Sequence, residues 1–206
     1  MDSSKTKILA ICGILAPLLY VATLVVGNVL DPSYSQIGKT VSELIQRGAP
    51  NRDLLNAMFV VYNILLIPFA FGLYASLGKG RARGVILIAL VINSVLGVAW
   101  TLFFPLDEGG KSVTLTGMLH LAVGALVVPI VFAIELASWR ATRRNDRWRL
   151  YSKFSLGIFV VTLVFGLLTV ALVNSDLRGL FERITTGSFL LWVEIVAIKV
   201  WNLASG

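Results

Sequence analysis

The sequence predicts an all-α fold, an integral membrane bundle of six transmembrane helices, on three observations. The chain has 206 residues, of which 57% are hydrophobic and only 14% are charged, and the apolar residues gather in six long runs. In an ordinary soluble domain about a quarter of the residues are charged. A helix of about 20 apolar residues is long enough to cross the hydrocarbon core of a bilayer. We therefore expect one membrane domain that covers residues 1–206.

The apolar runs set the expected spans in order along the chain. The first run is longer than the apolar core of a signal peptide and lacks a convincing small-residue cleavage site before Asp31, so we interpret it as a span. An even number of spans puts both termini on one side of the membrane. The expected spans cover approximately residues 8–30, 54–77, 84–105, 117–139, 153–174 and 187–203.

Basic residues between the spans indicate the orientation. They gather in residues 5–7, 79–83 and 140–153, whereas the other connections mix basic residues with acids. The positive-inside rule then places both termini in the cytoplasm and the protein in the cell membrane. The net charge is +7, and such a basic chain could bind nucleic acid. The Arg-rich stretch 140–153 is the part whose composition would suit that role. Its place between two spans favours a topology signal that contacts membrane lipids, and we expect no nucleic-acid partner.

The first connection, residues 31–51, is the one long polar interval in the first half of the chain. Its apolar residues follow a helical period, which predicts an amphipathic helix of about three turns over residues 33–47 at the membrane surface. Ser33 or Ser35 can cap the start of this helix, and Gly48 can end it. The apolar side of the predicted helix comprises Ile37, Val41, Leu44 and Ile45.

This predicted helix has two interpretations. In the functional one it is a cap over a polar pocket, and Ser42 and Glu43 are pocket residues. In the other one Lys39, Glu43 and Arg47 form a solvated ladder of charges, each four residues apart. Such a ladder contributes only about 0.2–0.5 kcal/mol per pair.

Acids stand where the outward-running spans end, and the single histidine stands near the start of the fourth span. A carboxylate at a helix C-terminus meets the negative end of the helix dipole, so Asp31 and Asp107 do not stabilise their own helices. Either acid could instead begin a turn. His120 beside an outer acid could act as an acid-base group. The alternative is that His120 is a structural residue with satisfied hydrogen bonds.

Two further groups of polar residues lie near or inside the last span. Arg183 has a planar guanidinium suited to a carboxylate or phosphate, although it could simply pair with Glu182. Glu194 lies inside the membrane, where a carboxylate is costly enough to suggest a function such as proton coupling. Its alternative role is a hydrogen bond within the bundle. Glu135 is expected to pair with Arg140 or to reach the membrane interface.

The residue inventory argues against several enzyme classes. The chain has one histidine and one cysteine, Cys12, so a zinc site and an internal disulfide are not expected. It has neither a phosphate-binding glycine loop nor the nucleophile elbow of a serine hydrolase. We therefore expect no metal and no cofactor.

Several short blocks carry a resemblance to a known family. They are Gly13 to Pro17, Asp31-Pro32-x-Tyr34-Ser35, Ser42-Glu43-Leu44 with Gly48-Ala49-Pro50, Pro105-x-Asp107 followed by His120, and Gly179 to Arg183 with Trp192. With these blocks the chain resembles, over nearly its whole length, the prokaryotic membrane family known as domain of unknown function 998. The resemblance implies a six-span bundle and a distant similarity to the Frag, DRAM and Sfk group. It implies no reaction.

The leading functional prediction is an outward-facing polar pocket that binds a lipid head group or small amphiphile, in a binding or transport-like protein. Arg183 and Arg47 would hold an anionic group, Glu43 and Asp107 a cationic or hydroxyl group, and His120 would titrate. One alternative is an intramembrane enzyme that acts on lipid head groups through His120 and Asp107. Another is a structural or assembly partner without a ligand. The predicted ligand-binding residues are Asp31, Ser42, Glu43, Arg47, Asp107, His120, Glu182 and Arg183.

Overall fold

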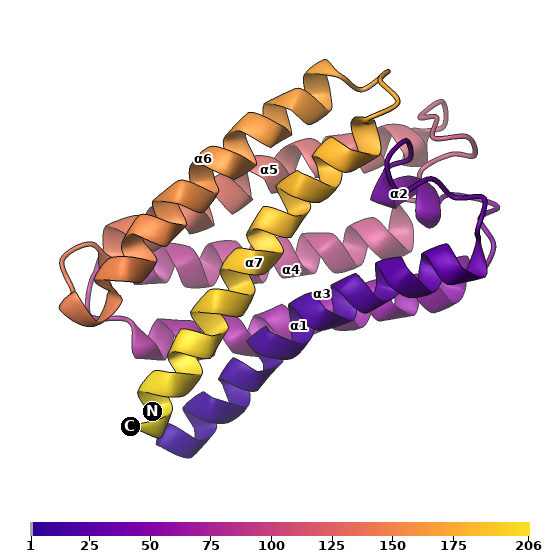
Figure 1. Ribbon diagram of the computed structural model, residues 1–206. Coiled ribbons are helices and arrows are strands. Elements are labelled where there is room, and N and C mark those ends of the chain that lie inside the picture. The colour runs from indigo at the N-terminus through magenta and orange to yellow at the C-terminus, as the bar shows by residue number, and fades with distance from the viewer. Residues whose placement is uncertain (1) are drawn as a thin grey trace.

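The computed structural model describes residues 2–206, which form seven α-helices and one short 3-10 helix (Figure 1). All the α-helices except α2 are long and apolar enough to cross a membrane, which confirms the predicted all-α six-span bundle. The elements are α1 (Ser3–Leu30), α2 (Val41–Leu44), α3 (Arg52–Ser76), α4 (Arg81–Phe103), α5 (Leu115–Thr142), η1 (Asp146–Trp148), α6 (Arg149–Ala171) and α7 (Arg178–Ser205).

The six long helices form a closed ring. Each one packs against the long helices before and after it in the chain, and α7 returns to pack against α1. The side chain of Ser3 contacts the carbonyl of Ala204, so the first and last helices begin and end side by side. Helix α2 lies at the opposite end (Figure 1). We call these ends the terminal end and the cap end. That the terminal end faces the cytoplasm stays a prediction.

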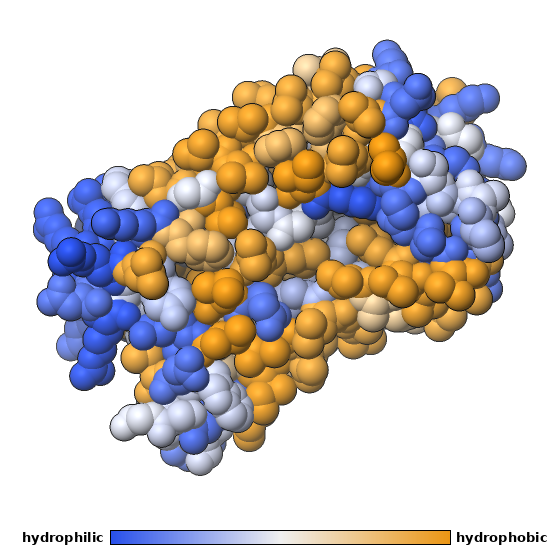
Figure 2. Space-filling model, viewed as in Figure 1, coloured by the Kyte–Doolittle hydropathy of each residue, from blue (hydrophilic) through white to orange (hydrophobic). Residues whose placement is uncertain are grey.

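On the face shown in Figure 2, an apolar band lies between two hydrophilic ends of the bundle. Large side chains on this band are open to the surroundings, for example Ile88, which is 60% exposed, and Leu167, which is 63% exposed. A soluble monomer rarely exposes so much contiguous apolar surface. In a bilayer these side chains face acyl chains, so the protein is a multi-pass membrane protein.

The last helix differs from its prediction. Helix α7 begins at Arg178 and not near residue 187, so the polar segment expected as a separate loop is the first part of the span itself. Its polar side chains do not need water, because Arg178, Glu182 and Arg183 bond to the first connection. Hydropathy alone placed the boundary too late for this reason.

The predicted three-turn helix over residues 33–47 is wrong in its length. Only α2 is helical there, and it starts at a capping box in which Thr40 and Glu43 bond to each other's backbone N–H. Before α2, two backbone carbonyls of the segment accept hydrogen bonds from α7 and not from within a helix of their own. The carbonyl of Ile37 accepts from the N–H of Leu180, and that of Gly38 accepts from Arg178. We call residues 31–51 the cap segment.

The half of the bundle at the terminal end is solidly packed. Leu66, Phe69, Trp192 and Ala197 are each fully buried there. Helices approach closely at Gly13, where an added Cβ would lie 2.6 Å from the Cγ atom of Phe69 and 2.8 Å from the Cβ of Ala197. This packed half holds the ring together, while the half at the cap end is built differently.

Candidate functional site

A cavity of about 290 Å³ lies inside the half of the bundle at the cap end. Every helix of the bundle contributes to its wall, including α2, whose Val41, Ser42 and Ile45 close it at the cap end. Each helix places at least one polar side chain on the wall. In chain order, examples are Tyr20, Ser42, Asn63, Asn93, His120, Thr162 and Glu182.

Two residues that line the cavity, one on α5 and one on α6, are also exposed on the apolar surface of the bundle. Val128 of α5 and Val170 of α6 both line the cavity, and they are 40% and 75% exposed. The wall near them is apolar and includes Val127 and Val131. The cavity thus has a polar part under the cap segment and an apolar side that faces lipid.

His120 and Ser42 are joined on the cavity wall. The His120 Nε2 atom lies 2.8 Å from the Ser42 hydroxyl, and its Nδ1 atom lies 2.7 Å from the carbonyl oxygen of Phe104. A carbonyl can only accept a hydrogen bond, so Nδ1 is the donor. In the neutral ring Nε2 is then the acceptor of the Ser42 proton. The ring of His120 also rests against Trp100, with 4.9 Å between the ring centroids.

Two residues that line the cavity each carry a buried polar atom without a partner. Within residues 2–206 neither the Asn93 Oδ1 atom nor the Trp100 Nε1 atom has a hydrogen bond. More than nine in ten buried polar groups in proteins are bonded, so such atoms need an explanation. Asn93 offers an acceptor and Trp100 a donor, and both residues line the same cavity.

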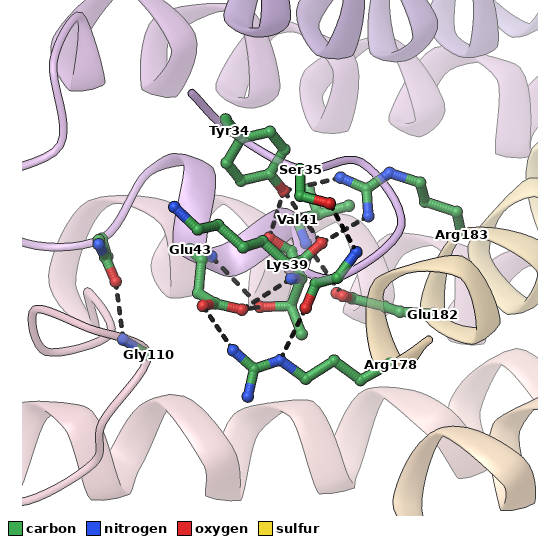
Figure 3. Close-up of polar contacts among 12 residues, drawn as sticks. Tyr34, Ser35, Lys39, Val41, Glu43, Gly110, Arg178, Glu182 and Arg183 are labelled. Carbon is green, nitrogen blue, oxygen red and sulfur yellow. Dashed lines mark hydrogen bonds and ion pairs between the residues drawn. The ribbon is translucent and has the colours of Figure 1, made fainter. Parts of the chain in front are cut away.

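Arg183 fixes the cap segment to α7 (Figure 3). Its guanidinium donates to the side chain of Gln36 at 2.8 Å, to the carbonyl of Lys39 at 2.7 Å and to the hydroxyl of Tyr34 at 2.7 Å. Tyr34 in turn donates to the carbonyl of Thr40. Burial raises the pKa of Tyr34 to about 12, although Arg183 acts against this rise. The phenol therefore stays protonated and keeps its role as donor.

Arg178 fixes the segment a second time, through Glu43 (Figure 3). The two side chains form an ion pair at 2.8 Å, and Arg178 also donates to the carbonyl of Gly38 at 3.1 Å. The cap segment approaches the backbone of α7 so closely that position 179 requires glycine. An added Cβ there would lie 2.8 Å from the carbonyl oxygen of Ile37. Glu43 thus serves the cap segment and does not line the cavity.

Arg47 and Asp107 join the other side of the cap segment to the start of α5. Asp107 accepts from the hydroxyl of Thr114 at 2.6 Å and from its backbone N–H at 2.8 Å, and Arg47 lies 3.4 Å away. These hydrogen bonds, with a smaller contribution from Arg47, lower the pKa of Asp107. Arg47 also contacts the hydroxyl of Thr116.

The predicted ligand residues therefore fall into two groups. Ser42, His120 and Glu182 line the cavity, and the Glu182 carboxylate accepts from the backbone N–H of Val41 at 2.9 Å. His120 and Asp107, predicted to work together, take separate partners. The residues that hold loops instead of lining the cavity are Glu43, Arg47, Asp107 and Arg183, and Asp31, which accepts from Ser33 within a turn.

Glu135 differs from expectation. It is fully buried and accepts from Thr162 at 2.9 Å, so both expected roles, pairing with Arg140 and reaching the membrane interface, are wrong. Glu194 lies inside the last span, and its Oε2 atom has no hydrogen bond within residues 2–206. Nowhere in that range do three His, Cys, Asp or Glu side chains gather as a metal ion would require.

Sequence reasoning overlooked the polar stripe of α4. Asn93, Gly97 and Trp100 all line the cavity, and they stand at i, i+4 and i+7. This spacing puts them on one face of a helix, so a search for small and polar residues at helical period would have found them.

The comparison with known families covers this whole region. Residues 14–199 match the model of the family described as Protein of unknown function (DUF998). The chain belongs to the DUF998 family. The matched range contains the cap segment and every residue of the cavity wall. No curated protein and no solved structure matches the chain. The more distant similarity to the Frag, DRAM and Sfk group stays a prediction.

Proposed function

We propose that this DUF998 protein binds a small single-chain amphiphile with an uncharged polar group in the cavity beneath the cap segment. The observation that carries the proposal is that two residues lining the cavity have a buried polar atom without a hydrogen bond, Asn93 Oδ1 and Trp100 Nε1. Leaving a buried polar atom unpaired costs about 1–3 kcal/mol. A hydroxyl or amide group both donates and accepts, so a bound group of this kind could pair with either atom.

The distribution of charge supports an uncharged polar group over an anionic one. In the described part of the chain, residues 2–206, no arginine or lysine lines the cavity. The arginines at the cap end already hold protein groups, as Arg183 holds Lys39 and Arg178 holds Glu43. A buried phosphate would therefore lack a cation, and the desolvation cost of a buried charge is high.

The size and shape of the cavity support a single chain. Its volume of about 290 Å³ is just below the roughly 300–1,000 Å³ found for small-molecule sites. Val128 and Val170 line the cavity and are exposed on the apolar surface, so the chain would leave toward lipid beside them. The ligand would enter from the bilayer of the cell membrane, with its polar group under α2.

Thermal unfolding of the purified protein in detergent tests this proposal. Decanol should raise the midpoint, whereas decane and decyl phosphate at the same concentration should raise it less. Ligand at 100 times its Kd stabilises the folded state by about 2.7 kcal/mol, which is a readily measured shift.

The variant Asn93→Leu should abolish the decanol effect. Asn56→Leu is the matched control, because Asn56 is equally buried and its Oδ1 atom is also unbonded within residues 2–206, but it does not line the cavity. Equal decanol shifts in the two variants would contradict the proposal.

A further inference from the structure

We propose that Ser42 is a nucleophile and His120 its general base, and that the pair transfers the acyl group of an ester-bearing amphiphile held in the cavity. This inference rests on the proposed binding function and adds a reaction to it. It replaces the acid-base pair of His120 and Asp107 expected from the sequence, because Asp107 is engaged by Thr114 and Arg47.

The geometry matches that of an activated nucleophile. Such sites place a hydroxyl within hydrogen-bond reach of a base, and a third group orients the base. Here the Ser42 hydroxyl lies 2.8 Å from His120 Nε2, and the carbonyl of Phe104 holds Nδ1 at 2.7 Å. The carbonyl fixes the tautomer that leaves Nε2 free to accept a proton. A carboxylate commonly has this orienting role, and a backbone carbonyl fills it here.

The position of the pair suits a substrate that arrives from lipid. Both Ser42 and His120 line the cavity, and the capping box of Thr40 and Glu43 fixes the turn that carries Ser42. The Glu182 carboxylate holds the same turn through the N–H of Val41. Ser42 is thus held in place by contacts that do not involve its own hydroxyl.

Trp100, which packs against His120, has an unused hydrogen-bond donor that could serve the developing oxyanion. The Trp100 Nε1–H group is buried and has no partner in residues 2–206, and its ring lies against that of His120. A donor aimed at the oxygen on which charge develops contributes about 10²–10³ to the rate. Trp100 would donate to the ester carbonyl and hold the acyl group beside Ser42.

The proposed reaction balances with an ester and water. The Ser42 oxygen forms a bond to the carbonyl carbon, and its proton passes to His120 Nε2. The bond from that carbon to the alcohol oxygen then breaks, and His120 gives its proton to the leaving alkoxide. Water repeats the two steps on the acyl-serine, which releases the carboxylic acid and restores the Ser42 hydroxyl.

A decyl fluorophosphonate tests the nucleophile directly, because its phosphorus takes the place of the carbonyl carbon. The Ser42 oxygen forms a bond to phosphorus, fluoride leaves, and the serine proton leaves through His120. Full-length protein in detergent should gain one decylphosphonyl group by intact mass, and peptide mapping should place it on Ser42. Ser42→Ala should abolish the label, while Ser35→Ala, an exposed serine of the same segment, should keep it.

The variant His120→Gln separates catalysis from a structural role. Glutamine can still accept a hydrogen bond from Ser42 but cannot take its proton, so labelling should slow by about 10²-fold or more. Unchanged labelling in this variant, or labelling of Ser42 no faster than of Ser35, would show that the Ser42–His120 bond only holds α2 in place.

Decanol binding, measured on the same samples, distinguishes the two proposals. Binding without labelling overturns the acyl-transfer inference and leaves the binding function standing. Loss of both overturns both. Labelling of Ser42 that decanol prevents supports both at once.

Discussion

The two halves of the bundle have the same helices but opposite interiors. At the terminal end the helices meet through large buried side chains such as Phe69 and Trp192, and Gly13 permits their close contact. At the cap end the same helices carry small and polar residues, for example Gly97, Gly124 and Thr162, and they enclose a cavity. The difference predicts that the packed half supplies most of the stability, whereas the hollow half has room for the proposed ligand.

Replacing one tryptophan in each half should give the largest difference in stability between the two halves. Trp192 is fully buried and donates to Ser155 at 3.0 Å, so Trp192→Ala should lower the free energy of unfolding by about 3–5 kcal/mol. Trp100→Ala should cost less, because Trp100 already borders empty space and its N–H bonds nothing within residues 2–206. Unfolding by denaturing detergent measures both, and equal losses would contradict the comparison.

Alanine at two glycines gives a smaller contrast. In Gly13→Ala the new Cβ would overlap Phe69 and Ala197, and overpacking of this kind costs about 1–3 kcal/mol. The Cβ of Gly166→Ala would have its nearest neighbour at 3.7 Å, an ordinary contact with Thr185. This variant should therefore keep or gain stability, since alanine is the better helix former by up to about 1 kcal/mol. The same unfolding assay compares the two variants.

The cap segment depends on contacts that only an arginine can make. Arg183→Lys keeps the charge but loses the fork that reaches Gln36, Lys39 and Tyr34 together, at a local cost of about 1–2 kcal/mol. Hydrogen–deuterium exchange of the amides in residues 34–44 should become faster. Arg140→Lys at the terminal end should leave this exchange unchanged. Equal protection in the two variants would mean that Arg183 does not hold the segment.

The smallest effect we predict concerns pH at the start of α5. Because the pKa of Asp107 is lowered in the folded protein, its carboxylate stabilises this region above the ordinary aspartate pKa of about 3.9. This stability is lost as the pH falls through the lower folded value. Amide exchange in residues 107–117, corrected for its intrinsic pH dependence, should rise there in wild type and not in Asp107→Asn. An equal rise in exchange in wild type and in Asp107→Asn would mean that another group titrates there.

Hydropathy predicted the membrane helices because a lipid-exposed chain must satisfy its backbone internally, and helices do so. The cap segment was predicted less well because its partners are distant in sequence. The carbonyl of Lys39 bonds to Arg183, and the hydroxyl of Ser42 bonds to His120. Helical period reports which residues share a face and not what that face meets. Glu135 was misassigned for the same reason, since its partner Thr162 lies on another helix.

Tryptophan fluorescence gives the most direct test of the hollow half. The chain has five tryptophans, so variants that keep only Trp100 or only Trp192, with phenylalanine at the other positions, report on one half each. A long-chain alcohol that carries bromine at its far end quenches indole fluorescence at short range. It should quench Trp100 in a saturable way that unbrominated decanol reverses, and it should leave Trp192 bright. Equal and unsaturable quenching of both would contradict an amphiphile site in the cavity.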